Sequence, residues 1–167
     1  CFVWGESLMA QTYDAIASQT LTSNQTTVSF TSIASSWTDL ILVINASPAG
    51  TAGYDIAVTF NSDTSSAYSR TYMLGNGSAA SSGRSSSQTS WAPCGLYNNL
   101  NLIIQLNNYS NATTYKTMMA RANIDSQYTA ATVGLWRSTS AISRIDLNAV
   151  ASPNVNICFN SKNYGRG

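Results

Sequence analysis

The feature that most constrains this chain is a succession of short apolar segments separated by polar turns. Aromatic and β-branched residues mark the segments, and Gly, Asn, Ser and Pro mark the intervals between them. No long stretch repeats its apolar residues at the helical period. The pattern predicts strands at 15–21, 27–30, 39–45, 54–60, 67–74, 100–106 and 155–159, with three more around 115–119, 133–136 and 142–147.

Strands at this spacing, roughly every 8–12 residues and without alternating helices, predict an all-β domain. We expect an antiparallel two-sheet, jelly-roll-like β-sandwich of about 8–10 short strands. An immunoglobulin-like sandwich is the alternative, although the cysteine–tryptophan–cysteine spacing of that fold is absent. The three strands between residues 115 and 147 are joined by short polar turns. We expect them in one sheet, with the rest of the chain pairing with it or closing over it.

Three segments carry specific expectations about burial. Residues 39–45 are apolar on both faces, which predicts a strand buried on both sides, or one buried between the sheet and a neighbouring subunit. Residues 54–60 alternate strictly, which predicts a half-buried strand with Asp55 facing out. Residues 75–90 are low in complexity and have no periodicity, so they are expected to form a long loop that ends at Trp91.

The composition places these strands in one folded domain with a neutral exterior. The chain has 167 residues, of which 44% are hydrophobic and only 9% are charged, against about 25% in a typical protein. Ser, Thr, Asn and Gln fill the surface instead, which is typical of extracellular, virion or adhesin domains packed side by side. The net charge of +1 gives no reason to expect a nucleic-acid partner or an anionic membrane surface.

The first eight residues are interpreted as an extension outside the domain. Residues 1–8 lack the basic and apolar parts of a signal peptide, and Met9 begins a stretch that looks like a natural start. We therefore place a single β-sandwich domain at 9–167 and expect the native protein to begin at or just after Met9. No apolar run approaches the roughly 20 residues needed to span a bilayer, so no membrane partner is expected.

Catalytic and metal-binding patterns are absent from the sequence. The chain has no histidine, which removes Ser–His–Asp and Cys–His triads and imidazole-based zinc sites. Its seven carboxylates show no spacing that would place two of them across one bond, and the loop 61–65 is interpreted as an Asx turn rather than a calcium site. One disulfide is possible, but Cys94, in a predicted loop, and Cys158, in a predicted strand, are expected to be free thiols. We expect no cofactor and no enzymatic activity.

Two groups of side chains remain as candidates for contacts with other molecules. Sugar or receptor binding would require exposed aromatic residues, and the candidates in or beside predicted loops are Trp91, Tyr97, Tyr109 and Tyr128. Core packing or subunit contact explains such residues equally well. We expect the second group to lie on solvated strand faces and to contact other subunits or a shell. It consists of the basic residues Lys116, Arg121, Arg137 and Arg144.

Several longer motifs carry a family resemblance. They read Asn-Asn-Tyr-Ser-Asn-Ala-Thr-Thr-Tyr-Lys-Thr over 107–117, Val-Gly-Leu-Trp-Arg-Ser-Thr-Ser-Ala-Ile over 133–142, Phe-Asn-Ser-Asp-Thr over 60–64 and Leu-Gly-Asn-Gly-Ser-Ala-Ala over 74–80. Together with the stretch that starts at Met9, they resemble small all-β structural proteins of tailed bacteriophages, notably cyanophage-like and marine phages. The likeness covers residues 9–165.

The resemblance implies a virion component without catalytic residues, made in the host cytoplasm and located on the outer surface of the capsid or tail. A head decoration (cement) protein would sit on the shell as homotrimers, contact the major capsid protein and reinforce the head. A tail-fibre or appendage module would contact tail proteins and present loops to a host receptor or its glycans. Jelly rolls serve both roles.

The cement role is favoured because the chain reads as one compact domain without a stalk. Such a domain needs a large interface to stay attached, repeated by symmetry. The apolar strand 39–45 and the pair Met118 and Met119 are candidate contributors to it.

Overall fold

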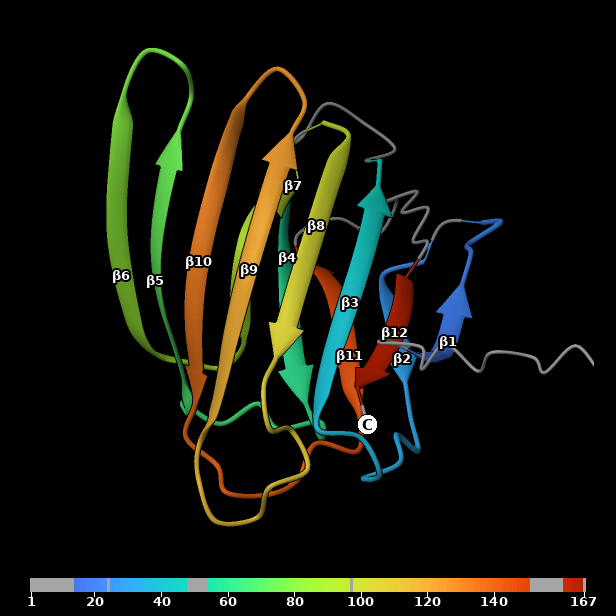
Figure 1. Ribbon diagram of the computed structural model, residues 1–167. Helices are drawn as coiled ribbons and strands as arrows, with labels where there is room; N and C mark the ends of the chain where they lie inside the picture. The colour runs from blue at the N-terminus through green and yellow to red at the C-terminus, as the bar shows by residue number, and fades with distance from the viewer. Residues whose placement is uncertain (1–13, 24, 48–53, 97, 151–160, 167) are drawn as a thin grey trace, which may run out of the picture.

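Twelve β-strands and no helix lie in the part of the chain that the computed structural model describes, residues 14–23, 25–47, 54–96, 98–150 and 161–166. They form an eight-stranded sheet in the order β1-β12-β3-β8-β9-β10-β5-β6 and a four-stranded sheet in the order β2-β11-β4-β7. The sheets are the two layers of a β-sandwich (Figure 1). The strands are β1 (Asp14–Gln19), β2 (Thr27–Phe30), β3 (Asp39–Ala46), β4 (Tyr54–Phe60), β5 (Tyr68–Gly75), β6 (Ala80–Gln88), β7 (Trp91–Leu96), β8 (Leu100–Leu106), β9 (Lys116–Ile124), β10 (Tyr128–Trp136), β11 (Ile145–Val150) and β12 (Ser161–Arg166).

Eight of these strands follow the jelly-roll topology. β1 pairs with β12, β2 with β11, β3 with β8 and β4 with β7, so the pairs are nested as in one long hairpin. β12 also pairs with β3, and β11 with β4, which rolls that hairpin into two sheets of four strands. All of these pairings are antiparallel. The predicted two-sheet, jelly-roll-like sandwich is confirmed.

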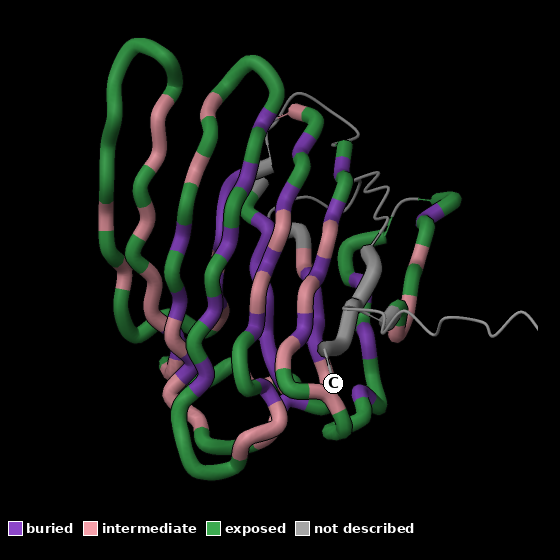
Figure 2. The backbone as a smooth tube through the Cα atoms, viewed as in Figure 1, coloured by how far each residue is buried: buried purple, intermediate pink, exposed green. Residues whose placement is uncertain are grey.

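Two further hairpins widen one of the sheets. The β5–β6 hairpin is inserted between β4 and β7, the β9–β10 hairpin between β8 and β11, and both continue the large sheet beyond β8. The small sheet ends at β7, which lies against β10, β5 and β9. The β5–β6 hairpin therefore extends past the second layer, so that β5 is mostly half-buried and β6 is mostly exposed (Figures 1 and 2).

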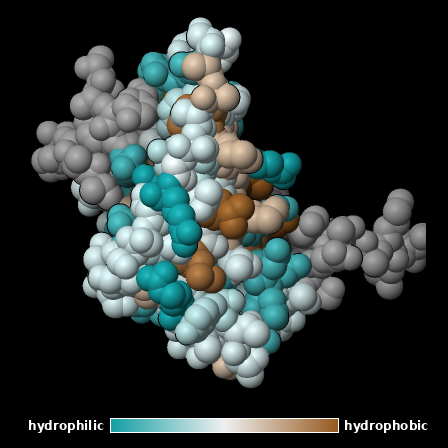
Figure 3. Space-filling model, turned by 90° about the vertical axis from the view of Figure 1, so that its left-hand side faces the viewer, coloured by the Kyte–Doolittle hydropathy of each residue, from teal (hydrophilic) through white to brown (hydrophobic). Residues whose placement is uncertain are grey.

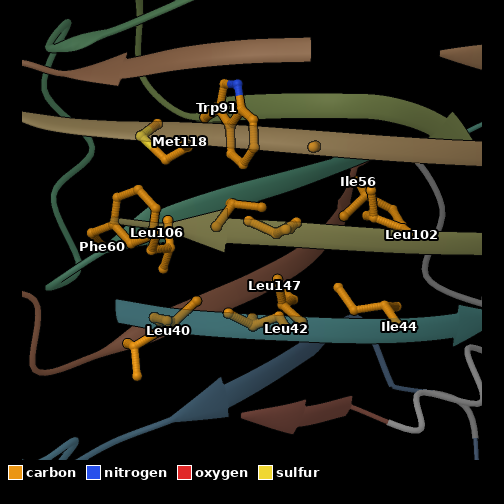
Figure 4. Close-up of a cluster of buried hydrophobic side chains, with 14 of the residues drawn as sticks. Leu40, Leu42, Ile44, Ile56, Phe60, Trp91, Leu102, Leu106, Met118 and Leu147 are labelled. Atoms are coloured by element: carbon orange, nitrogen blue, oxygen red, sulfur yellow. The ribbon is translucent and has the colours of Figure 1, made fainter. Parts of the chain in front are cut away.

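The core lies between the two sheets, where alternate side chains of both layers meet (Figure 4). Burial alternates residue by residue along β8 and β9, the period of a strand with one face in the core. Side chains that are at most 1% exposed include Leu40, Leu42, Ile44, Ile56, Val58, Phe60, Leu102, Leu106, Met118 and Leu147.

An aromatic cluster closes one end of this core. Ring centroids of Phe60, Tyr68 and Trp136 lie 5.5 to 6.2 Å apart. The Tyr68 hydroxyl accepts from the Phe60 amide and donates to the Asp63 carbonyl, each at 3.0 Å. Trp136 Nε1 donates to Asp63 Oδ2 at 2.7 Å, and Asp63 Oδ1 accepts from the Ser65 amide at 2.8 Å. The second bond makes the predicted Asx turn, and together the bonds tie the loop after β4 to the cluster.

Trp91 of β7 packs directly against the inner side of Gly134 of β10. A Cβ atom at Gly134 would lie 2.4 Å from Trp91 Nε1 and 2.7 Å from both Cδ1 and Cε2. The indole is 1% exposed, and Nε1 has no hydrogen-bond partner among the described residues. Glycine is required at this point of β10 because the ring occupies the volume of any side chain there.

The prediction of a long loop at 75–90 is wrong. After a turn in which Asn76 Oδ1 accepts from the amides of Ser78 and Ala79, residues 80–88 form strand β6. Its sequence, Ala-Ser-Ser-Gly-Arg-Ser-Ser-Ser-Gln, has almost no apolar side chain that could show a period. Pairing with β5 makes it a strand. Strand β7 also contains Trp91, which was expected to end this loop, and Cys94, which was expected in a loop.

Two other expectations need correction. Residues 142–147 do not pair beside β10, because the chain crosses to the small sheet, where β11 lies between β2 and β4. Strand β4 is not half-buried, since Ala57 and Thr59 are only 4% and 6% exposed, although Asp55 does face out as predicted. Strand β3 is buried on one face and partly buried on the other.

Three predictions lie outside the described residues. They are the extension at residues 1–8, the start at Met9, and the strand 155–159 with Cys158.

Candidate functional site

The outer face of the large sheet carries apolar side chains that point away from the core. Val133 of β10 lies opposite Met119 of β9, and Met73 of β5 lies opposite Ala131 of β10. Val133 is 53% exposed, Met119 47% and Met73 64%. Their positions follow from the alternation of side chains along each strand, which turns these residues outward whenever their neighbours enter the core. We call Met73, Met119, Ala131 and Val133 the outer apolar patch.

The outer apolar patch continues into apolar side chains on the same face. Leu135 of β10 and Ile103 of β8 are half-buried, and Ile103 lies opposite Arg121. Strands β5, β8, β9 and β10 are described throughout, and Arg121 is the one charged residue on their outer face. Figure 3, seen from the β6 edge, shows apolar side chains in brown at the surface among paler polar ones. Apolar side chains gathered in one area, rather than scattered singly, are typical of interaction sites.

The outer face of the small sheet is different in character. Ser29 Oγ donates to Asp146 Oδ1 at 2.6 Å, and Arg144 Nε donates to both Asp146 oxygens at 2.8 to 2.9 Å. Burial alone would raise the pKa of Asp146, but the hydrogen bonds from Arg144 and Ser29 and the charge of Arg144 outweigh it and hold that pKa below its ordinary value. Where its side chains are described, this face is therefore polar and internally bonded, in contrast to the outer apolar patch on the large sheet.

The three arginines predicted as subunit or shell contacts lie in different places. Arg121 is exposed on the outer face of the large sheet, beside the outer apolar patch. Arg137 follows β10 and donates from Nη2 to the Ser66 carbonyl at 2.7 Å. Arg144 forms its 2.8 Å ion pair with Asp146 on the small sheet. The structure does not bring the three together, and Arg121 alone is placed to join a contact made through the patch.

Two of the four aromatic residues predicted as exposed are buried, and that expectation is corrected. Trp91 fills the space beneath β10, and Tyr109 is 0% exposed, with its hydroxyl bonded to backbone groups between β2 and β3. Tyr128 is half-buried, and its hydroxyl accepts from the Gly95 amide at 3.0 Å. Tyr97 lies outside the described residues. Trp91 is buried because it lies in strand β7 and faces β10, whereas Tyr109 lies in the turn after β8 and is covered there by the loop between β2 and β3.

Lys116, predicted on a solvated face, is instead 2% exposed. Its Nζ donates to the carbonyls of Thr114 at 2.8 Å and Thr139 at 3.2 Å, and burial lowers its pKa. The lysine therefore joins the loops on either side of the β9–β10 hairpin. Cys94 is a free thiol, as predicted, and burial raises its pKa to about 12, which leaves it protonated and unreactive at neutral pH.

The sequence pointed to only part of the outer apolar patch. It singled out Met118 and Met119 as a pair, but neighbours in a strand face opposite ways, so Met119 is exposed and Met118 is fully buried. Met73 and Val133 were missed. Alternation along each strand could have marked them as outward, but only the register of β10 with β5 and β9 places them side by side.

The fold and this surface together define a jelly-roll β-sandwich with one apolar outer face. No protein-family model, curated protein or solved structure matches the chain. Across the residues that are described, no three His, Cys, Asp or Glu side chains gather where they could hold a metal ion. The same residues include no helix with the length and apolar character needed to cross a membrane.

Proposed function

We propose that this protein is a non-enzymatic structural protein of a tailed-phage virion, and specifically a head decoration protein that binds and reinforces the capsid shell. The observation that carries the proposal is the outer apolar patch of Met73, Met119, Ala131 and Val133. Covering apolar surface contributes about 25 cal/mol per Å², so such a patch favours a partner. The motif resemblance supplies the kind of partner, a protein of the phage particle.

The two outer faces suit a protein held between a shell and solvent. The face of the large sheet offers apolar contacts with Arg121 beside them, and the face of the small sheet is polar. In the proposed arrangement, the large sheet faces the major capsid protein and neighbouring copies. Homotrimers on the shell would repeat one contact by symmetry, each reaching the roughly 800 Å² per partner of a stable interface.

The alternative is a tail-fibre or appendage module, or a lectin-like domain that binds a host receptor glycan through its aromatic residues. The tail-fibre role rests on the same motif resemblance as the cement role, whereas sugar binding was expected to use four exposed aromatic side chains. Two of these, Trp91 and Tyr109, are in the core, which weakens the support for sugar binding through them. The outer apolar patch instead favours contact with another protein.

Undecorated phage heads provide the test. Purified protein is titrated onto the heads, the bound fraction is measured by co-sedimentation, and the melting temperature of the heads is recorded. Val133→Asp places a charge at the centre of the outer apolar patch, where covering it without a partner costs more than about 1.4 kcal/mol. Binding should therefore weaken at least about tenfold. Ser140→Asp, in the exposed loop before β11, is the matched control and should bind like the wild type.

Saturable binding that raises the melting temperature of the heads, and that Val133→Asp alone weakens, supports the proposal. Failure of the wild-type protein to bind heads would overturn the cement role. Equal binding by both variants would show that another face makes the contact.

A further inference from the structure

The overhanging strands leave part of the inner face of the large sheet without a covering layer. Inward side chains of β10 are buried from Thr132 to Trp136 but only half-buried at Tyr128 and Ala130. Those of β5 beyond Tyr68 are half-buried as well, namely Arg70, Tyr72 and Leu74. This region faces the edge of β7, which lies against β5 and β10.

A cleft of about 220 Å³ lies between β7 and this uncovered face. Tyr72, Leu74 and Tyr128 line it from the large sheet, and Asp55 and Arg70 carry its two charges. A second cavity of about 140 Å³ is lined by the same two charged residues. In a chain with only 9% charged residues, two opposite charges at one cleft stand out.

The two charges are not paired with each other, and only Arg70 is held in place by its neighbours. Arg70 Nη1 donates to the Ala92 carbonyl at 2.6 Å, and its guanidinium lies 5.3 Å from the centroid of the Tyr72 ring. The Asp55 carboxylate has no hydrogen bond or ion pair among the described residues. Arg70 is thus oriented by its neighbours, while Asp55 keeps its full capacity to accept hydrogen bonds.

A glycine fixes the place of the Tyr72 ring. Tyr72 lies opposite Gly83 of β6, and a Cβ atom at Gly83 would lie 2.5 Å from the Tyr72 hydroxyl oxygen and 2.6 Å from Cζ. The ring therefore occupies the space above the glycine and forms part of the cleft wall. A larger residue at position 83 would displace it.

We propose that this cleft binds a single neutral sugar ring. Sugar hydroxyls both donate and accept, so adjacent hydroxyls satisfy a carboxylate that only accepts and a guanidinium that only donates. One positive and one negative charge leave the cleft without net charge, which favours a neutral ligand over an anion. The C–H surfaces of the sugar cover Leu74 and the ring of Tyr72. Pockets for drug-sized ligands have volumes of about 300–1,000 Å³. The cleft is smaller than these pockets, which limits its occupant to one sugar ring.

This site is on the opposite side of the large sheet from the outer apolar patch and does not depend on the proposed structural role. A decoration protein with such a site could hold host-surface sugars while its other face stays on the shell. Success or failure in head binding therefore leaves the sugar test unaffected.

The test is a titration of ¹⁵N-labelled full-length protein followed by NMR, with methyl α-glycosides of glucose, galactose and mannose as neutral probes. Inorganic phosphate serves as the anionic probe. A ligand of about a dozen heavy atoms is expected to bind with a Kd on the order of a millimolar. Amides of Thr132, Gly95 and Tyr72, at the cleft, should shift in a saturable way with at least one glycoside.

Three variants make the result specific. Asp55→Ala removes the free carboxylate, and Gly83→Ala displaces Tyr72; each should weaken binding at least about tenfold. Ser82→Ala, one residue earlier on the opposite face of β6, should bind like the wild type. The Tyr72 ring is half-buried and can move, so Gly83→Ala keeps its fold. No saturable shift with any glycoside, stronger binding of phosphate, or unchanged binding in both cleft variants would overturn the proposal.

Discussion

Replacing Gly134 by alanine tests how tightly β7 is packed beneath the large sheet. The new Cβ would lie 2.4 Å from Trp91 Nε1, whereas favourable contacts between heavy atoms occur near 3.5–4.0 Å. Relieving the clash requires a shift of about 1 Å in a ring that is 1% exposed. Overpacking of this kind costs about 1–3 kcal/mol. For a domain of this size, 1 kcal/mol lowers Tm by about 2–4 °C, so we expect a fall of roughly 2–12 °C.

Gly75→Ala is the matched control for this substitution. A Cβ atom at Gly75 meets nothing within 4 Å, and the residue lies at the end of β5. Its substitution should be neutral or slightly stabilising, because alanine restricts the unfolded chain. Both variants are compared by calorimetry and urea denaturation, and a common m-value would show that the unfolded state is unchanged.

A double-mutant cycle identifies the contact itself. Trp91→Phe removes the pyrrole part of the indole, including the buried Nε1 without a partner, so Gly134→Ala should cost at least about 1 kcal/mol less in that background. If Gly134→Ala is no worse than Gly75→Ala, or if its cost is the same in the Trp91→Phe background as in the wild type, the packing described for β7 is wrong.

Three further predictions follow from buried polar groups. The folded pKa of Asp146 lies below its unfolded value near 4, so the contribution of Asp146 to stability is complete above that value and is lost as pH falls through the lower folded pKa. Asp146→Asn should therefore flatten the fall of the urea midpoint below about pH 4. Parallel plots of urea midpoint against pH for the variant and the wild type would contradict this. Lys116→Met leaves two loop carbonyls without their donor and should lower the free energy of unfolding, measured by urea denaturation, by about 1–3 kcal/mol. A decrease below about 0.5 kcal/mol would contradict this. Burial raises the pKa of Cys94 to about 12, so iodoacetamide at pH 8 should leave this thiol unmodified until urea is added. Peptide mass spectra measure the modification. Rapid labelling of Cys94 in the native protein would refute its burial.

Local pattern was enough to predict most strands and the class of the fold. Strands such as β8 carry their own signal, since apolar residues recur at every second position. Strand β6 carries none, because its serines and glycine have no preferred face, and only its partner β5 makes it a strand. The sheet assignment of β11 was missed for a related reason. A short loop after β10 looks the same in sequence whether the chain returns to its own sheet or crosses to the other.

The candidate surface was harder to predict than the strands. Exposure of Trp91 was inferred from a loop that does not exist, and burial of Lys116 depends on carbonyls from two separate loops. Met73 and Val133 become neighbours only through the register of three strands. Side-chain alternation indicates which way a residue points, but long-range pairing decides which residues meet.

The most direct test of the proposed shell contact is a cryo-electron microscopy map of the phage particle in which the proposal places this protein. The proposal predicts density for the domain on the outer surface of the head. It also predicts that the β5, β9 and β10 face, with Met73, Met119 and Val133, is covered by the major capsid protein or by neighbouring copies. Density for the domain only in the tail, or on the head with this face open to solvent, would contradict the account.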